Sequence, residues 1–266
     1  TNDNPTPAPR RAWLAAWRTY LEPASLRMFT LGFSAGLPLL LVLGTLSFWL
    51  REAGIDRTTI GYLSWVGLAY GFKWVWAPLV DRMPIPPLTT LLGRRRGWLL
   101  LSQMLVMAGL VGMAFNDPQQ SLQPVVWCAL AVAFGSATQD IALDAFRIES
   151  ADADHQAALA ASYQTGYRLA MIWAGAGVLW LASRAETAPL AGAVDAAQAY
   201  QHGAWKTAYL VMAASMLVGV ITVLLSPEPA HHPLPPARDA ADKNAIENVH
   251  ADERQRPDCQ RNVGPG

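Results

Sequence analysis

The stretch GSATQDIALDAFR, residues 135–147, closes a long apolar run, yet it contains an amide, two carboxylates and a guanidinium. At helical spacing, Asp140 and Asp144 lie one turn apart on the same face. In a soluble protein this stretch would be an ordinary helix end. Inside a bilayer an ionisable side chain is costly, so it usually faces a bundle interior or a water-filled cavity. Whether the run lies in a membrane therefore decides both the fold and the function.

The composition favours a membrane protein. Apolar residues make up 52% of the 266 residues and charged residues only 15%. Most of the charge lies between apolar runs or near the two ends. The net charge of zero argues against a nucleic-acid partner. Cys128 lies in an apolar run and Cys259 near the C-terminus, and two such thiols form neither a disulfide framework nor a metal site.

Apolar runs of about 20 residues, the length that crosses a ~30 Å hydrocarbon core, recur along the chain. The first run is too long for a signal-peptide core and lacks a clear cleavage site. Its Gly36 permits close helix approach, and its Pro38 can kink a span. We therefore predict an all-α membrane protein whose transmembrane bundle has six helices. The predicted spans are residues 28–50, 60–80, 98–115, 124–145, 157–182 and 205–225.

The ends of the chain and the loops predict the domain organisation and the orientation. Residues 1–27 are basic and aromatic, which indicates an N-terminal segment with an interfacial helix. Residues 28–225 form the bundle, and residues 226–266 lack an apolar period and are predicted to be a disordered tail. Arginine concentrates in the N-terminal segment and the second loop, so both termini are predicted to be cytoplasmic. These arginines are Arg10, Arg11, Arg18, Arg27, Arg82, Arg94, Arg95 and Arg96.

A loose internal repeat of three helices plus three accompanies this pattern. The letters FSAG at 33–36 in the first span are similar to FGSA at 134–137 in the fourth. Gly61-Tyr62, followed by Lys73, is loosely similar to the GYR triplet at 166–168. Inverted repeats are typical of transporters, and their small-residue interruptions often mark the substrate path. Gly36 and Tyr167 are therefore candidate pathway residues.

Three charged groups from three spans are predicted to share one layer of the bundle. Counting residues from the cytoplasmic ends places Asp140 and Arg168 ~15–18 Å deep and Lys73 ~12 Å deep. A pairing of Asp140 with Arg168 or with Lys73 would lower the burial cost of each. Asp140 and Arg168 are too deep to reach the interface easily, which favours a cavity role. We predict a substrate and proton pathway here.

Simpler interpretations stay open for some of these side chains. Lys73 can extend to the interface beside neighbouring tryptophans instead of facing a cavity. Asp144 and Arg147 can end their helix in the headgroup region, which is the preferred interpretation of Arg147. Gln139 lies next to Asp140 on a slightly different face and is a candidate ligand.

The sequence does not favour an enzyme. It contains no nucleophile elbow, no phosphate-binding loop and no pair of catalytic acids in a soluble segment. The five histidines lie in loops or in the tail without the spacing of metal ligands. We therefore predict no catalytic residue, no metal site and no cofactor.

Several segments resemble one family of transporters. Asp81-Arg82 followed by the letters GRRRG at 93–97 resembles the loop signature of the major facilitator superfamily. More narrowly, five segments resemble the AmpG-type muropeptide permeases, in unbroken order from about residue 26 to 229. These segments are LGFSAGLP at 31–38, APLVDR at 77–82, GRRRGWLL at 93–100, SATQDI at 136–141 with Asp144, and GYRL at 166–169.

The resemblance implies a bacterial inner-membrane permease that imports cell-wall sugar peptides with protons. It also implies a conformational-switch loop that contains Asp81, Arg82, Gly93, Arg94 and Arg95. Family members have a second bundle of at least six helices, whereas no apolar run follows residue 225, so we expect the N-terminal half of a permease. The connector at 83–92 is also longer than the family's spacer. The alternatives are a permease related to acetyl-CoA transporters and a non-transporting membrane remnant or assembly subunit.

Overall fold

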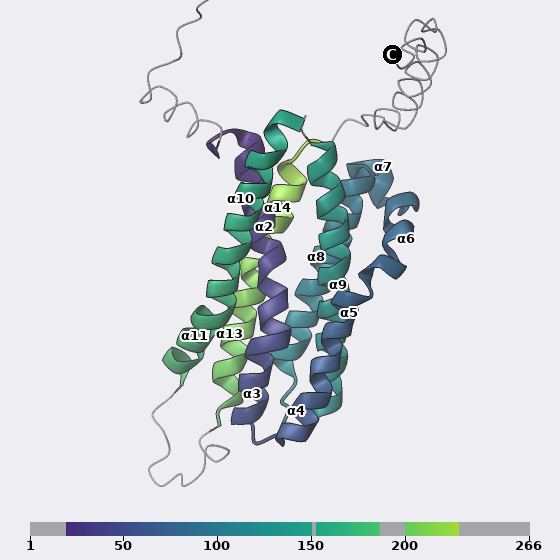
Figure 1. Ribbon diagram of the computed structural model, residues 1–266. Helices are drawn as coiled ribbons and strands as arrows, with labels where there is room; N and C mark the ends of the chain where they lie inside the picture. Colours follow the sequence, from purple (N-terminus) through teal and green to yellow (C-terminus); the bar gives the residue numbers. More distant parts are fainter. Residues whose placement is uncertain (1–19, 151–152, 187–199, 229–266) are drawn as a thin grey trace, which may run out of the picture. The chain divides into compact units, whose positions relative to one another are not determined.

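The computed structural model describes residues 20–150, 153–186 and 200–228, which form helices and connecting turns without a β-strand (Figure 1). The predicted interfacial helix before residue 20 and the predicted tail after residue 228 lie outside the described residues.

The first predicted span is a continuous helical path of 30 residues, Pro23–Glu52. It consists of α2 (Pro23–Leu40), the π-helical turn η1 (Leu41–Thr45) and α3 (Leu46–Glu52). The hydroxyl of Thr45 donates a 2.8 Å hydrogen bond to the carbonyl of Ala174. Ala174 lies in a second π turn, in the fifth span, so the two irregular turns support each other.

The second predicted span is a series of short helices instead of one continuous helix. Glycines at 61, 67 and 71 and a proline at 78 recur through it, and both residue types weaken regular helix. The chain therefore changes between α and 3-10 geometry several times. The pieces are α4 (Arg57–Leu63), η2 (Ser64–Gly67), α5 (Leu68–Gly71), η3 (Lys73–Val75) and α6 (Ala77–Arg82), and the short α7 (Leu88–Leu92) follows.

The remaining spans are long helices. They are α8 (Arg94–Phe115), α9 (Leu122–Glu149), the fifth span α10 (Ala153–Ile172) with η4 (Trp173–Gly177) and α11 (Val178–Ala185), and the sixth span α13 (His202–Ser215) with α14 (Leu217–Leu225). Within the described residues, four segments are long and apolar enough to cross a membrane: residues 23–52, 94–115, 122–149 and 202–225. The second predicted span is too broken to qualify. The fifth does not qualify either, and it has polar side chains such as Gln164 and Arg168 along its length.

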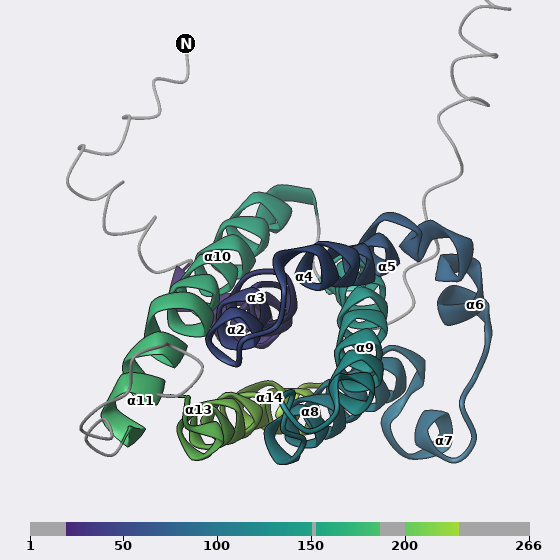
Figure 2. The ribbon, with the colours of Figure 1, turned by 90° about the horizontal axis from the view of Figure 1, so that it is seen from below.

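These two segments complete the bundle by packing on the four apolar ones. Viewed along the helices, α2 and α3 lie between α10 on one side and α4 and α5 on the other (Figure 2). α8, α13 and α14 close the opposite side, and α6 and α7 lie outside α9 (Figure 2).

Glycine brings the backbones of α2 and α10 into direct contact. A Cβ added at Gly36 would overlap the carbonyl oxygen of Tyr167, and one added at Gly166 would overlap that of Phe29. Such small-residue contacts are the usual means by which membrane helices approach closely. A similar contact joins α8 and α9, where a Cβ on Gly135 would lie 3.2 Å from the carbonyl oxygen of Ser102.

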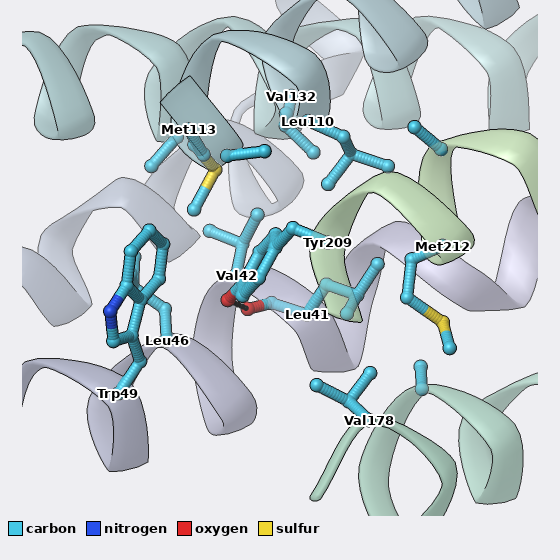
Figure 3. Close-up of a cluster of buried hydrophobic side chains, with 14 of the residues drawn as sticks. Leu41, Val42, Leu46, Trp49, Leu110, Met113, Val132, Val178, Tyr209 and Met212 are labelled. Carbon is cyan, nitrogen blue, oxygen red and sulfur yellow. Dashed lines mark hydrogen bonds between the residues drawn. The ribbon is translucent and has the colours of Figure 1, made fainter. Parts of the chain in front are cut away.

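The larger apolar core of the described residues contains side chains from all six predicted spans, including Trp49, Leu110, Val132, Val178 and Tyr209 (Figure 3). Trp49 and Tyr209 are fully buried there, with ring centroids 4.8 Å apart. The Tyr209 hydroxyl donates to the carbonyl of Leu41 at 3.2 Å, so the buried phenol has a partner. Leu110 and Met113 of α8 pack against these residues (Figure 3).

We predict that Gly166→Ala destabilises the bundle by roughly 1–3 kcal/mol, because the added methyl group pushes α10 away from α2. Thermal unfolding of the purified chain in detergent measures this change. Gly61→Ala is the matched control, because a Cβ on Gly61 meets no atom within 4 Å. Equal stability of the two variants would contradict the close contact of α2 with α10.

Candidate functional site

Lys73 and Asp140 form an ion pair between the broken second span and the middle of α9. The Lys73 Nζ lies 3.8 Å from the Asp140 Oδ2. The lysine side chain is 40% exposed, and the aspartate side chain only 15%. The other carboxylate oxygen of Asp140, Oδ1, is buried without a hydrogen-bond partner among the described residues. The ion pair is therefore long, its lysine is partly exposed, and one carboxylate oxygen of Asp140 lacks a hydrogen bond within the described residues.

Arg168 forms no ion pair with Asp140 among the described residues, although its predicted depth made such a pairing possible. The arginine is exposed on α10, and no ion pair forms between it and Asp140 in the described parts. The reason is the packing of α10, which places Gly166 and Ala170 against α2. Arg168 is two residues from each of them, so helical geometry turns it away from α2.

Asp144 pairs within its own helix. One of its oxygens lies 3.4 Å from the Arg147 guanidinium, one turn along α9. The same guanidinium lies 5.8 Å from the ring centroid of Tyr163. The ring of Tyr167 is partly buried and lies 5.9 Å from that of Tyr163. Asp144 and Tyr163 thus both lie beside Arg147, and Tyr167 lies beside Tyr163.

Gln139 is directed into the bundle and does not reach the open face. Its side chain is fully buried, and its Nε2 donates to the Ser34 hydroxyl at 3.0 Å. Gln103 of α8 donates to the same hydroxyl at 3.3 Å, and Ser34 itself donates to the carbonyl of Leu31. A Cβ on Gly219 of α14 would lie 2.7 Å from the Gln103 amide. Four helices therefore meet at one serine.

Ser34 and Gln103 are absent from the sequence-based site, although both are polar residues inside apolar runs. Such residues are costly in a membrane unless they are paired, which is the signal that points to them. Gly36, another predicted pathway residue, is likewise buried in the contact with α10. In this conformation Gln139 and Gly36 contribute to packing.

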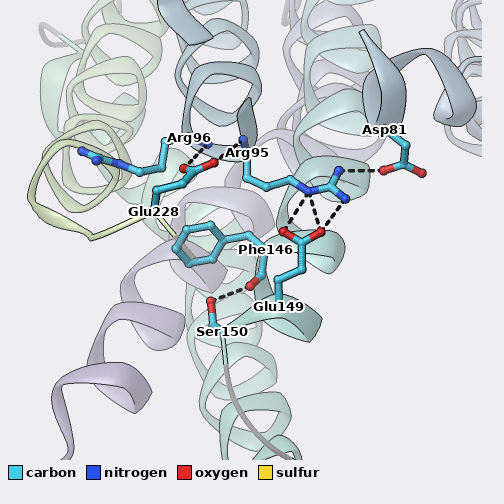
Figure 4. Close-up of polar contacts among 7 residues, drawn as sticks. All are labelled: Asp81, Arg95, Arg96, Phe146, Glu149, Ser150 and Glu228. Carbon is cyan, nitrogen blue, oxygen red and sulfur yellow. Dashed lines mark hydrogen bonds and ion pairs between the residues drawn. The ribbon is translucent and has the colours of Figure 1, made fainter. Parts of the chain in front are cut away.

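Arg95 forms a second charged cluster where α6, α8 and α9 meet (Figure 4). Its guanidinium lies 2.7 Å from Asp81 and 2.7 Å from Glu149, and its Nε donates to Glu149 at 3.0 Å. Arg95 is only 8% exposed, so it depends on these two carboxylates for the hydrogen bonds that water would otherwise supply. Three segments are therefore held together by one side chain.

The ends of α8 and α14 cap each other beside this cluster. The Glu228 carboxylate accepts hydrogen bonds from the backbone N–H groups of Arg95 and Arg96, at 2.9 and 3.3 Å (Figure 4). In return, the Arg96 guanidinium donates to the carbonyl oxygens of residues 223 and 224, at 2.8 and 2.7 Å. Free N–H groups at a helix start and free carbonyls at a helix end are thus both satisfied.

Gly93 is required at the start of α8. Its φ of 90° is in the region that favours glycine, and a Cβ there would overlap the Glu228 carboxylate. Of the predicted loop residues, the structure gathers Asp81, Gly93 and Arg95, with Arg94 partly exposed beside them. Arg82 ends α6 exposed and makes no ion pair within the described ranges. Those ranges also hold no group of residues suited to a metal ion.

The described residues thus form an all-helical bundle in which an ion pair joins the second and fourth spans. Residues 28–255 match the model of the Major Facilitator Superfamily. The chain belongs to this superfamily and is a multi-pass membrane protein.

Two groups of relatives support the narrower resemblance. The anhydromuropeptide permease of Escherichia coli K12 is 39% identical over 212 residues, which are 80% of this chain and 39% of that protein. The putative transporter AmpG 4 of Rickettsia felis is 40% identical over 155 residues, which are 58% of this chain and 37% of that protein. The resemblance to AmpG-type permeases is confirmed, and the chain spans about two-fifths of the length of these curated relatives.

Ser34→Ala should destabilise the bundle by roughly 1–3 kcal/mol, because the buried amide groups of Gln103 and Gln139 lose the hydroxyl that accepts their hydrogen bonds. Thermal unfolding in detergent measures the loss. Ser183→Ala is the control, since that exposed hydroxyl bonds only to its own helix at 3.0 Å. Adding Gln103→Leu to Ser34→Ala should recover part of the stability, and a further loss would contradict this account.

Glu228→Ala should lower stability by roughly 0.5–2 kcal/mol, the range for loss of a helix cap. The reason is that the first N–H groups of α8 lose their carboxylate acceptor. Glu22→Ala provides the comparison, because Glu22 precedes α2 without a side-chain capping bond. Urea unfolding of both variants tests the effect, and equal midpoints would show that the capping contributes nothing.

Proposed function

We propose that the chain is the N-terminal half of a permease that imports cell-wall muropeptides into bacteria with protons. The observation that carries this proposal is the Lys73–Asp140 pair on the open face of a bundle that belongs to this superfamily. The substrate class comes from the similarity to the anhydromuropeptide permease of Escherichia coli. Muropeptides have carboxylates, so a cation on the transport path suits them.

The geometry of the pair suggests how proton and substrate are coupled. At 3.8 Å, Lys73 holds Asp140 by charge attraction without a hydrogen bond of normal length. A proton on Asp140 removes the negative charge that attracts Lys73. The lysine, which is already 40% exposed, is then free to bind a carboxylate of the substrate. Each ligand thus favours the binding of the other, which is the requirement for symport.

Other parts of the site take supporting roles in this proposal. Arg168 offers a second exposed cation for the carboxylates of the peptide. Asp144 lies one turn beyond Asp140 and helps to draw protons toward it, while Tyr167 borders the same path. A charged face of this kind is unfavourable against lipid, so we propose that a second six-helix bundle covers it.

The Arg95 cluster is the proposed conformational switch. It ties α8 to α6 and α9, and the adjacent capping ties α8 to α14, so the cluster can hold four segments in one arrangement. The concentration of arginine here supports our proposal that this end, and both termini, lie on the cytoplasmic side of the inner membrane. Residues 28–225 then form the transmembrane bundle, with residues 1–27 and 226–266 as its cytoplasmic extensions.

Asp140→Asn should abolish proton-driven uptake and leave exchange of substrate across the membrane intact, because the amide cannot change its charge. The assay is uptake of labelled anhydromuropeptide by cells that lack their own permease and express a complete permease carrying this half. Asp144→Asn is the control, with a smaller expected loss because Asp144 pairs with Arg147 and not with Lys73. Full proton-driven uptake by Asp140→Asn would refute the coupling role.

A further inference from the structure

A pocket of about 250 Å³ lies between the first and second spans, at the end of the bundle opposite the Arg95 cluster. Two arginines contribute to it: Arg51 from the last turn of α3, and Arg57, the first residue of α4. The other lining residues are Ser47, Phe48 and Ile60.

The turn between α3 and α4 brings the two arginines together. Gly54 has a φ of 81°, and its N–H bonds to the carbonyl of Arg51 at 3.1 Å. The N–H of Ile55 bonds to the carbonyl of Leu50 at 3.0 Å. These two bonds form a glycine-based helix end that reverses the chain within a few residues. The tight turn therefore brings the end of α3 and the start of α4, and with them Arg51 and Arg57, to the same pocket.

Neither acid of the same turn forms an ion pair with these arginines in the part of the chain that the structure describes. Asp56 accepts hydrogen bonds from the backbone N–H of Thr59 at 2.9 Å and from its hydroxyl at 2.6 Å. Among the described residues no carboxylate pairs with Arg51 or Arg57. Two guanidinium groups thus line one small pocket without a counter-charge from the described chain.

The chemistry of the pocket selects an anion attached to an apolar body. Guanidinium groups bind phosphate through paired hydrogen bonds. Phe48, which is 60% exposed, and Ile60 offer apolar surface directly beside the charges. The arginines lie at the ends of two membrane segments, the depth at which lipid headgroups are found. We infer that this pocket binds the headgroup phosphate of an anionic phospholipid, with the adjoining acyl chain against Phe48 and Ile60.

Native mass spectrometry of the purified chain tests this site and does not depend on transport. Phosphatidylglycerol and phosphatidylcholine are added in equal amounts, and the lipid retained by the protein is measured. The wild-type chain should retain phosphatidylglycerol in preference. Arg51→Gln combined with Arg57→Gln should weaken that binding about thirtyfold, as expected for two interfacial arginines.

The control is Arg27→Gln combined with Arg184→Gln, which removes two arginines outside the pocket and should leave the preference unchanged. If the double variant in the pocket cannot be purified, each single variant provides the same comparison. Equal retention of both lipids by the wild-type chain would overturn the inference. Displacement of phosphatidylglycerol by millimolar inorganic phosphate would also overturn it, because the pocket would then be a site for soluble anions.

Discussion

A charge that leaves water must find a partner, and this bundle satisfies that requirement in two different ways. Arg95 is almost fully buried and has short bonds to two carboxylates from two other segments. Asp140 has one partner, Lys73, at a distance too long for a good hydrogen bond. Separating Arg95 from its partners would leave a buried guanidinium unpaired. The Lys73–Asp140 pair is longer, and its lysine side chain is 40% exposed, so it is the weaker of the two contacts.

The capping between α8 and α14 explains why a run of arginines follows Gly93. The glycine leaves room for the Glu228 carboxylate, Arg95 reaches toward α6 and α9, and Arg96 reaches toward the end of α14. The run therefore contributes specific contacts as well as the positive charge that orients a membrane protein. Arg95 and Arg96 bond to different segments, and a count of charges alone does not predict these contacts.

Much of the fold could be predicted because long apolar runs have few alternatives in a bilayer. The deep carboxylate Asp140 could also be found, since a charge within such a run requires a partner. The direction of Gln139 could not, because it depends on Ser34 and Gln103, which come from other helices. The capping role of Glu228 could not be predicted either, because its partner Arg95 lies 133 residues away in the sequence. A hydropathy pattern predicts the length of a membrane helix. The packing of neighbouring helices determines which of its side chains face the bundle interior.

The second span is less regular than the other five. α2 and α10 are joined through glycine contacts between backbones, and α8 is capped to α14, so these helices form a framework that is hard to deform. The second span is instead a chain of short α and 3-10 pieces, a pattern often found at functional hinges. It carries Lys73, and Trp76 adds one more bond to α9, from its indole to Thr138 at 3.2 Å. The irregular segment thus holds one partner of the ion pair, Lys73, and the long helix α9 holds the other, Asp140. Under the proposed mechanism the pair opens by rearrangement of these short pieces, and the Arg95 cluster ties the last of them, α6, to α8 through Asp81.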